Sequence, residues 1–238
     1  MFYIDPLYLI LAAPGLLLGL WAQWRVKSNF DHYSRVTTSR GMTGSDVAEA
    51  ILRAQNIHNV RVEPVQGFLS DHYDPNGKVL RLSPDVYHGR SVAAAGVAAH
   101  EVGHAIQDAQ RYPFLQMRSN LVPVIQFASP FAVPIIIAGF FLSSLVGTGI
   151  GQLVTLGGIV LFGFVVLFQL VTLPVEFDAS KRALQTLEAN GIVRGEELKG
   201  ARDVLGAAAW TYVAAAVSAV LTLLYFLLRS GLLGGRRD

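Results

Sequence analysis

The chain contains no cysteine, and long parts of it contain no charged residue. The absence of cysteine excludes structural disulfides, thiolate zinc sites and a cysteine nucleophile, so any metal must be held by His, Asp or Glu. Residues 121–173 include no Asp, Glu, Lys, Arg or His, and neither do residues 6–24 and 206–228. Because an apolar run of about 18 residues or more can cross a bilayer as a helix, the sequence predicts an integral membrane protein.

Charge is scarce in the chain as a whole, and this scarcity excludes two classes of function. Charged residues make up 15% of the sequence against 52% apolar residues, and the formal net charge is only +2. Without a basic run, that charge is too small for a nucleic-acid-binding surface. The apolar runs also lack the ionisable residue that an ion or proton pathway usually carries, which argues against a transporter.

Four transmembrane helices account for the apolar runs. The first run ends at Trp21 and Trp24 and is followed by Arg25 instead of a small-residue cleavage site, so we expect an uncleaved anchor. The long run is divided at residues 147–149 by Gly-Thr-Gly, a connection that fits only a tight helical hairpin. The expected spans are residues 6–24, 121–146, 150–173 and 206–228.

Four spans place the two polar segments on the same side of the membrane. These segments hold 16 of the 19 Lys and Arg residues, so the positive-inside rule predicts that both face the cytoplasm. The expected division of the chain is an anchor (1–24), a cytoplasmic α+β lobe (25–120), a transmembrane hairpin (121–173), a cytoplasmic helical segment (174–205) and a last span with its tail (206–238).

The first polar segment carries signals for two helices and three short strands. Thr43 and Asp46 have the spacing of a capping box ahead of an amphipathic helix. Strand-like runs follow at residues 60–65, 67–74 and 78–83. The turn residues 75–77, Pro-Asn-Gly, predict a hairpin between the last two runs. Ser91 can cap an alanine-rich helix that extends over about residues 92–110.

The alanine-rich helix contains the HExxH pattern, with His100, Glu101 and His104 at its fixed positions. At about 100° per residue, the two histidines lie roughly 40° apart on successive turns, so both imidazoles can bind one metal ion. Glu101 falls near the same face, where it can reach a metal-bound water without ligating the metal. The expected fold is therefore mainly α and integral to the membrane, with four transmembrane helices and a cytoplasmic α+β zincin-like lobe built on this HExxH helix.

Other interpretations of the pattern stay open. The histidines could be ordinary core residues, although three polar groups on an apolar face are costly to bury without a metal. The chain could also be a non-catalytic zinc-binding membrane scaffold or interaction protein, although structural zinc needs no carboxylate adjacent to its ligands. A membrane-buried zinc helix of the site-2-protease kind is disfavoured, because the alanine-rich run is short for a span.

A catalytic zinc ion normally has three protein ligands and one open position. Glu176 is the candidate for the third ligand, because it follows Pro174 and lies three residues beyond the third expected span. The predicted hairpin returns this span to the side of the membrane that holds His104. The alternative is a solvated glutamate at a helix start, where a negative charge favours the helix dipole.

Two stretches of the sequence resemble a known family. These are GFLSDHYDPNGKVLRLSPDVYHGRSVAAAGVAAHEVGHAIQDAQ and PVEFDASKRAL, and they are similar to bacterial membrane zinc metallopeptidases of the YugP type. The resemblance covers roughly residues 1–225. It implies a zinc peptidase of the bacterial cell membrane with one Zn²⁺ per chain. In the implied site, His100, His104 and Glu176 match the metal ligands and Glu101 matches the catalytic base.

The chain also has a wider similarity to the gluzincin membrane proteases, among them HtpX and the CAAX proteases. In those proteases an aspartate four positions after the glutamate of the second motif supports a zinc-binding histidine. That position is Ser180 here, and Asp178 would point to a different helix face. Asp108, one turn beyond His104, is an alternative acceptor for the imidazole N–H that zinc-bound histidines usually donate.

The expected reaction is hydrolysis of a peptide bond. A zinc-bound water gives up a proton to Glu101 and attacks a carbonyl polarised by the metal, and Glu101 then passes the proton to the leaving amine. The oxyanion needs a further donor. The candidates in the strand-rich block are His72, Tyr73, Arg81 and His88. The run at residues 78–83 could bind an extended peptide by strand addition.

The expected partners follow from where the site lies. Because Glu176 sits just beyond a span, the site should lie at or just above the cytoplasmic surface of the membrane. We therefore expect the lipid bilayer and membrane or unfolded protein substrates as partners, and no nucleic acid.

Overall fold

The computed structural model describes residues 5–67 and 70–233. Phe68 and Leu69 of the second expected strand, and Arg236 and Arg237 of the tail, lie outside the described residues. The chain is mainly helical and divides into two compact units. Within the described residues, unit 1 comprises residues 5–20, 117–173 and 212–233, and unit 2 comprises residues 21–116 and 174–211.

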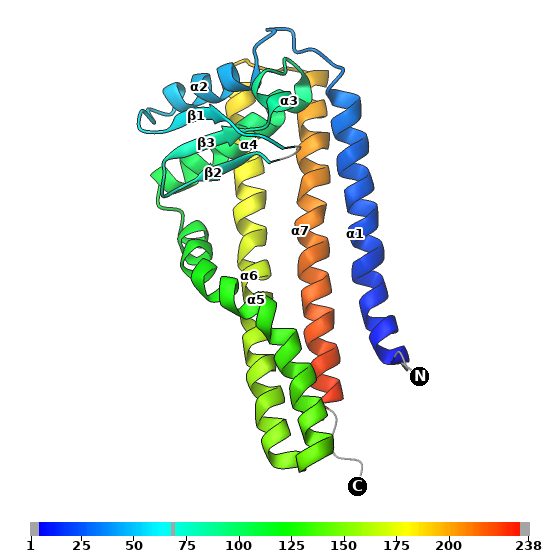
Figure 1. Ribbon diagram of the computed structural model, residues 1–238. Coiled ribbons are helices and arrows are strands. Elements are labelled where there is room, and N and C mark those ends of the chain that lie inside the picture. The colour runs from blue at the N-terminus through cyan, green and yellow to red at the C-terminus, as the bar shows by residue number, and fades with distance from the viewer. Residues whose placement is uncertain (1–4, 68–69, 234–238) are drawn as a thin grey trace. The chain divides into compact units, whose positions relative to one another are not determined.

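Four helices in the described part of the chain are long and apolar enough to cross a membrane, which confirms the expected number (Figure 1). They are α1 (Pro6–Tyr33), α5 (Pro113–Val146), α6 (Thr148–Ala189) and α7 (Glu196–Arg229). Each extends beyond its predicted apolar run. Helix α6, for example, continues through Pro174 as one helix, and this continuation carries Glu176 into unit 2.

Unit 1 is held together by small residues where its helices meet. Helix α5 ends at Val146, and Gly147, with φ +99°, forms the turn into α6. A Cβ on Gly139 of α5 would lie only 2.5 Å from the backbone nitrogen of Thr155 on α6. Helices in lipid pack through such small residues, because only these let two backbones approach closely. Large apolar side chains face outward instead, as Leu153 does with 70% of its surface exposed.

The described residues of unit 2 form one three-stranded sheet. Its strands are β1 (Arg61–Pro64), β2 (His72–Asp74) and β3 (Val79–Leu82), in the order β1-β3-β2. The predicted hairpin is confirmed, because β2 pairs antiparallel with β3. Strand β1 pairs parallel with β3, with Arg61 opposite Val79. The run at residues 78–83 is therefore the central strand, and the expectation that it binds a peptide by strand addition is wrong, because both of its edges are already paired.

The core of unit 2 is built around α4 (Val92–Ala109). Helices α2 (Gly44–Ala54) and α3 (Pro84–Tyr87) pack near it, and Leu80 of β3 is fully buried in the same core. Both predicted helix starts are confirmed, since Thr43 and Asp46 form the capping box of α2 and the Ser91 side chain caps α4. The alanines and glycines of α4 let neighbouring elements approach it on every side, and this burial fixes its position.

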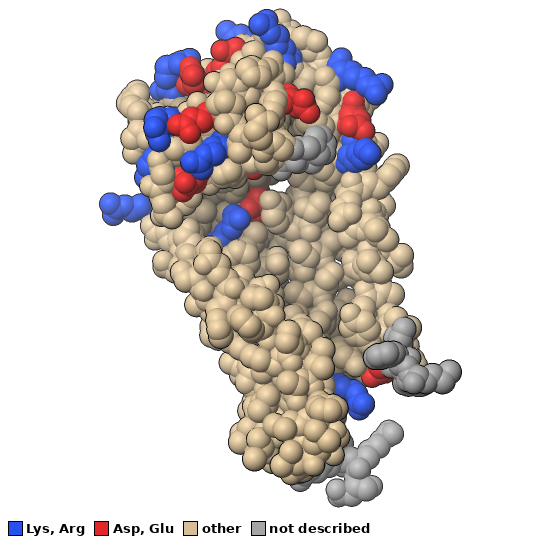
Figure 2. All heavy atoms as spheres, viewed as in Figure 1, with Lys and Arg blue, Asp and Glu red and all other residues tan. Residues whose placement is uncertain are grey.

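Charged side chains are distributed unevenly between the elements. On the face shown in Figure 2, Lys, Arg, Asp and Glu gather over α2, α3 and the sheet, and the surface of α5 is almost free of them. The apolar surface of the long helices suits contact with lipid tails, because a water-exposed patch of this size would be unusual on a soluble protein.

Candidate metal centre

Helices α4 and α6 come into backbone contact at Gly103. A Cβ at this position would lie 2.5 Å from the backbone oxygen of Ala179, which is closer than side-chain carbons approach in proteins. Ala179 lies one turn after Glu176 and directly before Ser180. The contact therefore brings both of these side chains to the face of α4 that carries the histidines. This close approach gives a physical reason for a glycine between the two histidines.

His100, His104 and Glu176 form a group that could hold a metal ion. Their ligand atoms all lie within 4.8 Å of one another. The Oε2 atom of Glu176 is 3.2 Å from His100 Nε2 and 3.6 Å from His104 Nε2. The Glu176 side chain is only 3% exposed, and the side chains of His100 and His104 are 12% and 10% exposed. Two imidazole nitrogens and one carboxylate oxygen are a donor set that suits Zn²⁺, so the residues present fit the ion.

The second nitrogen of each ring has its own partner. His100 Nδ1 lies 3.1 Å from Ser180 Oγ on α6, and His104 Nδ1 lies 3.0 Å from Gln107 Oε1 on α4. Both rings therefore turn their Nε2 atoms toward Glu176. Partners on the far nitrogen fix the ring orientation of metal-binding histidines.

Glu101 lies beside this group and is itself buried. Burial raises the pKa of Glu101 to about 7, because the charged carboxylate is removed from water. The backbone N–H of Tyr73 on β2 donates a hydrogen bond to the Glu101 carboxylate, which favours the charged form. A buried carboxylate with a pKa near neutrality can take up a proton and release it again.

Comparisons with known proteins identify the family of the chain. The profile of a family described as "Putative neutral zinc metallopeptidase" matches residues 8–231. The chain belongs to this family. It is also 47% identical over 222 residues to a protein named "Putative membrane protease YugP" from Bacillus subtilis (strain 168), an alignment that covers 93% of this chain and 96% of the relative. No solved structure was found to match the chain. The resemblance seen in the two motif stretches is thereby confirmed.

In the structure the partners of the histidines differ from those considered on sequence grounds. Asp108 accepts hydrogen bonds from the Tyr73 hydroxyl, at 2.6 Å, and from Lys78 Nζ, so it ties the β2–β3 hairpin to α4. Burial and the Asp108 carboxylate both raise the pKa of Tyr73 above its usual range, which keeps this hydroxyl protonated. The acceptor for His104 is Gln107 instead. Sequence reasoning missed Gln107, although its position three residues after His104 places the two on the same side of α4.

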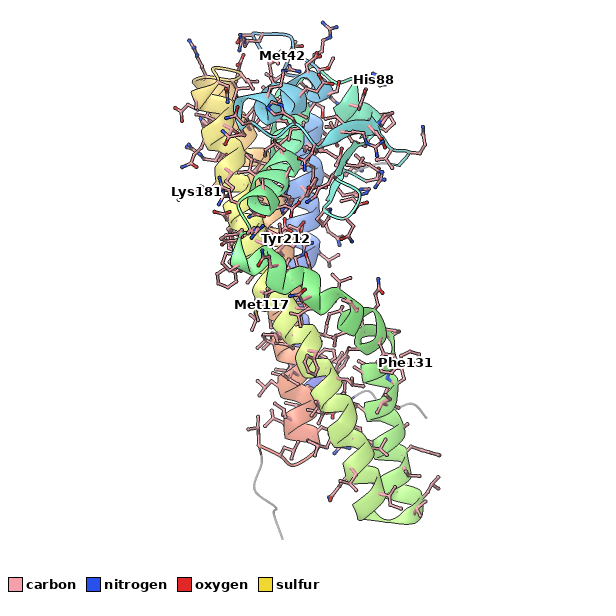
Figure 3. The ribbon with its side chains drawn as sticks, turned by 90° about the vertical axis from the view of Figure 1, so that its left-hand side faces the viewer. Met42, His88, Met117, Phe131, Lys181 and Tyr212 are labelled. Carbon is pink, nitrogen blue, oxygen red and sulfur yellow. The ribbon has the colours of Figure 1, made fainter. Side chains whose placement is uncertain are left out.

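Ser180 stands where the wider group of membrane proteases has an aspartate, and its hydroxyl is the group that contacts His100. Asp178 points elsewhere, as expected, and accepts hydrogen bonds from Gln107 Nε2 and Arg182 Nε. Lys181, which lies between Asp178 and Arg182 in the sequence, is on the side of α6 turned away from α4 (Figure 3). Glu176 and Ser180 therefore share the face of α6 that contacts the histidines directly.

The candidates for an oxyanion donor occupy separate places. His72 and Arg81 lie opposite each other on β2 and β3, where Arg81 Nη1 is 3.4 Å from Asp74 Oδ2. His88 is exposed at the end of α3, where its ring packs edge-on against Tyr87 (Figure 3). Tyr73 is the candidate that contacts Glu101, through its backbone N–H and not through its hydroxyl. The identity of the donor stays a prediction.

Proposed function

We propose that the chain is a zinc-dependent endopeptidase of the HExxH type that cleaves membrane or membrane-adjacent proteins at the cytoplasmic surface of the bacterial cell membrane. The observation that carries this proposal is the convergence of His100, His104 and Glu176 within 4.8 Å, with the buried carboxylate of Glu101 beside them. Membership in a zinc metallopeptidase family supports it. His100, His104 and Glu176 would hold one zinc ion.

The chemistry divides between the metal and the chain. Bound zinc would polarise the peptide carbonyl and make water more acidic. Glu101 takes the proton from the attacking water and returns it to the leaving amine, which is the role of a general base that then acts as an acid. The N–H of Tyr73 holds the Glu101 carboxylate in place during both transfers. Burial of the glutamate keeps competing water away from it.

Strand β2 suggests how a substrate binds. It is an edge strand, because only one of its two sides pairs with another strand, β3. The backbone N–H of Tyr73 on β2 points toward Glu101. An extended peptide that pairs with the remaining backbone groups of β2 would run past the base. Such main-chain pairing tolerates many sequences, so the preferred substrates are unfolded or extended segments.

The orientation of the site rests on charge. Residues 25–120 and 174–205, which supply every residue of the metal group, hold 16 of the 19 Lys and Arg residues. The positive-inside rule places such segments in the cytoplasm. Charged segments next to apolar helices keep the site near the membrane surface.

Replacing Glu101 by Gln tests the proposed catalytic role. We expect Glu101→Gln to bind zinc as the wild type does and to lose hydrolysis of fluorescently labelled unfolded casein by roughly 10²- to 10⁴-fold, because the amide cannot accept the proton. Glu63→Gln is the matched control, since Glu63 lies on β1 and pairs with Arg61 at 3.5 Å. Hydrolysis by Glu101→Gln at the wild-type rate would refute the role of Glu101. A wild type that binds zinc and cleaves nothing would favour the scaffold interpretation.

A further inference from the structure

Gln107 is a fully buried glutamine whose amide makes three hydrogen bonds. Its Nε2 donates to the backbone oxygen of Val175 and to Asp178 Oδ2, both at 2.8 Å. Its Oε1 lies 3.0 Å from His104 Nδ1. The residue has 0% of its surface exposed, so no bulk water replaces any of these partners. Both donors of the amide are therefore used on groups of α6, and its acceptor faces the histidine.

These partners allow the amide only one orientation. A backbone oxygen and a carboxylate can only accept hydrogen bonds. If the amide were turned over, its oxygen would face these two acceptors and both of its hydrogens would lose their partners, which is costly inside a protein. Arg182 Nε donates to the same Oδ2 of Asp178 and holds that carboxylate in place one turn further along α6.

The fixed amide in turn determines the tautomer of His104. Because Gln107 Oε1 can only accept, the hydrogen of the neutral imidazole must reside on Nδ1. In the neutral ring the lone pair is then on Nε2, the nitrogen that lies 3.6 Å from Glu176 Oε2. Because the ionised Glu176 carboxylate also only accepts, it competes with Gln107 for the hydrogen of the ring. His100 differs in this respect, since its partner is the hydroxyl of Ser180, which can donate or accept.

We propose that Gln107 is a positioning residue that fixes the tautomer and ring orientation of His104, with its own amide set by Val175 and Asp178 of α6. The packing of α6 against α4 thereby prepares His104 as a ligand before any metal binds. This inference adds a positioning residue to the proposed function. Its consequence for zinc binding rests on that function. The hydrogen bonds that carry the inference are present in the metal-free chain.

The first test measures the tautomer directly. Detergent-purified, metal-free protein with ¹³C,¹⁵N-labelled histidine is studied by NMR, and the His104 signals are assigned by their loss in His104→Gln. We expect a hydrogen on Nδ1 of His104 in the wild type. Gln107→Met keeps the length of the side chain but removes the amide acceptor, so the hydrogen of the neutral ring should move toward Nε2, where the Glu176 carboxylate can accept it. Gln110→Met is the control, because Gln110 caps the C-terminal end of α4 and its Oε1 accepts from Arg182 Nη1 without contacting a histidine.

A second variant separates positioning from stability. Gln107→Glu keeps an oxygen opposite His104 Nδ1 but turns its other oxygen toward two acceptors. We expect it to keep the Nδ1–H form although its thermal unfolding midpoint falls below that of Gln107→Met. If Gln107 had a purely structural role, the less stable of the two variants would also show the larger change in the tautomer of His104. That result, or an Nε2–H form in the wild type, would overturn the inference.

Zinc affinity gives the functional readout. In a competition with a chelator, Gln107→Met should bind zinc about 10- to 100-fold more weakly than the wild type, the usual effect of losing a partner of a metal-binding histidine. Gln110→Met should bind as the wild type does. A wild type without zinc affinity would contradict the proposed function, whereas equal affinity in wild type and Gln107→Met would contradict the role of Gln107 alone.

Discussion

The contact between Gly103 and Ala179 predicts that a single methyl group at position 103 will separate the metal ligands. An alanine Cβ at this position would lie 2.5 Å from the Ala179 oxygen, 3.0 Å from its carbonyl carbon and 3.1 Å from its Cα. All three atoms belong to the backbone of α6, so no side chain can rotate away. To restore ordinary van der Waals contact, α4 and α6 must move apart by about 1 Å.

The expected effect on stability is small, and the effect on the site is large. Replacing a helical glycine by alanine favours the helix by about 1 kcal/mol, whereas overpacking a core costs about 1–3 kcal/mol. Gly103→Ala should therefore range from neutral to about 2 kcal/mol less stable than the wild type. Glu176 moves with α6, however, and a misplacement of about 1 Å in a catalytic site can cost roughly a hundredfold in rate.

The control for this variant is in the same helix. Gly96→Ala adds the same methyl group, but its Cβ would lie 3.6 Å from the Ala201 Cβ, an ordinary contact. We expect Gly96→Ala to raise the thermal unfolding midpoint in detergent and to leave zinc affinity and casein hydrolysis unchanged. Gly103→Ala should lose both zinc affinity and hydrolysis while it remains folded. If Gly103→Ala bound zinc as tightly as Gly96→Ala, the reasoning from the α4–α6 contact would be refuted.

Two further predictions concern the third ligand and the orientation of the chain. Glu176→Ala should lose zinc more readily than the wild type under mild chelation, as measured by mass spectrometry. The control is Glu188→Ala, which replaces an exposed glutamate of the same helix and should keep its zinc. If both variants retained zinc equally, the third ligand would have to be another residue. Because the chain has no cysteine, a single introduced cysteine reports the side of the membrane on which it lies. In intact cells a membrane-impermeant maleimide should label Gly149→Cys, an exposed position in the first turn of α6, and should spare His58→Cys in unit 2. The reverse pattern would place the site outside the cytoplasm.

The sequence by itself was sufficient where the signal is local. The number of apolar helices, the caps at Thr43 and Ser91 and the β2–β3 hairpin depend on residues near one another in the chain, and the structure agrees with each. The spacing of His100 and His104 is likewise a property of one helix. Glu176 could be proposed as their neighbour because a hairpin returns to the side from which it started.

Tertiary structure alone decided the contacts between distant segments. The parallel pairing of β1 made β3 the central strand, and no local pattern encodes which of three short strands lies between the others. The partners of the histidines depend on how closely α6 packs at Gly103, which brings Ser180 to His100 and joins Gln107 to Asp178. A hydrogen bond is sensitive to tenths of an ångström, and that precision comes from packing rather than from spacing along the chain.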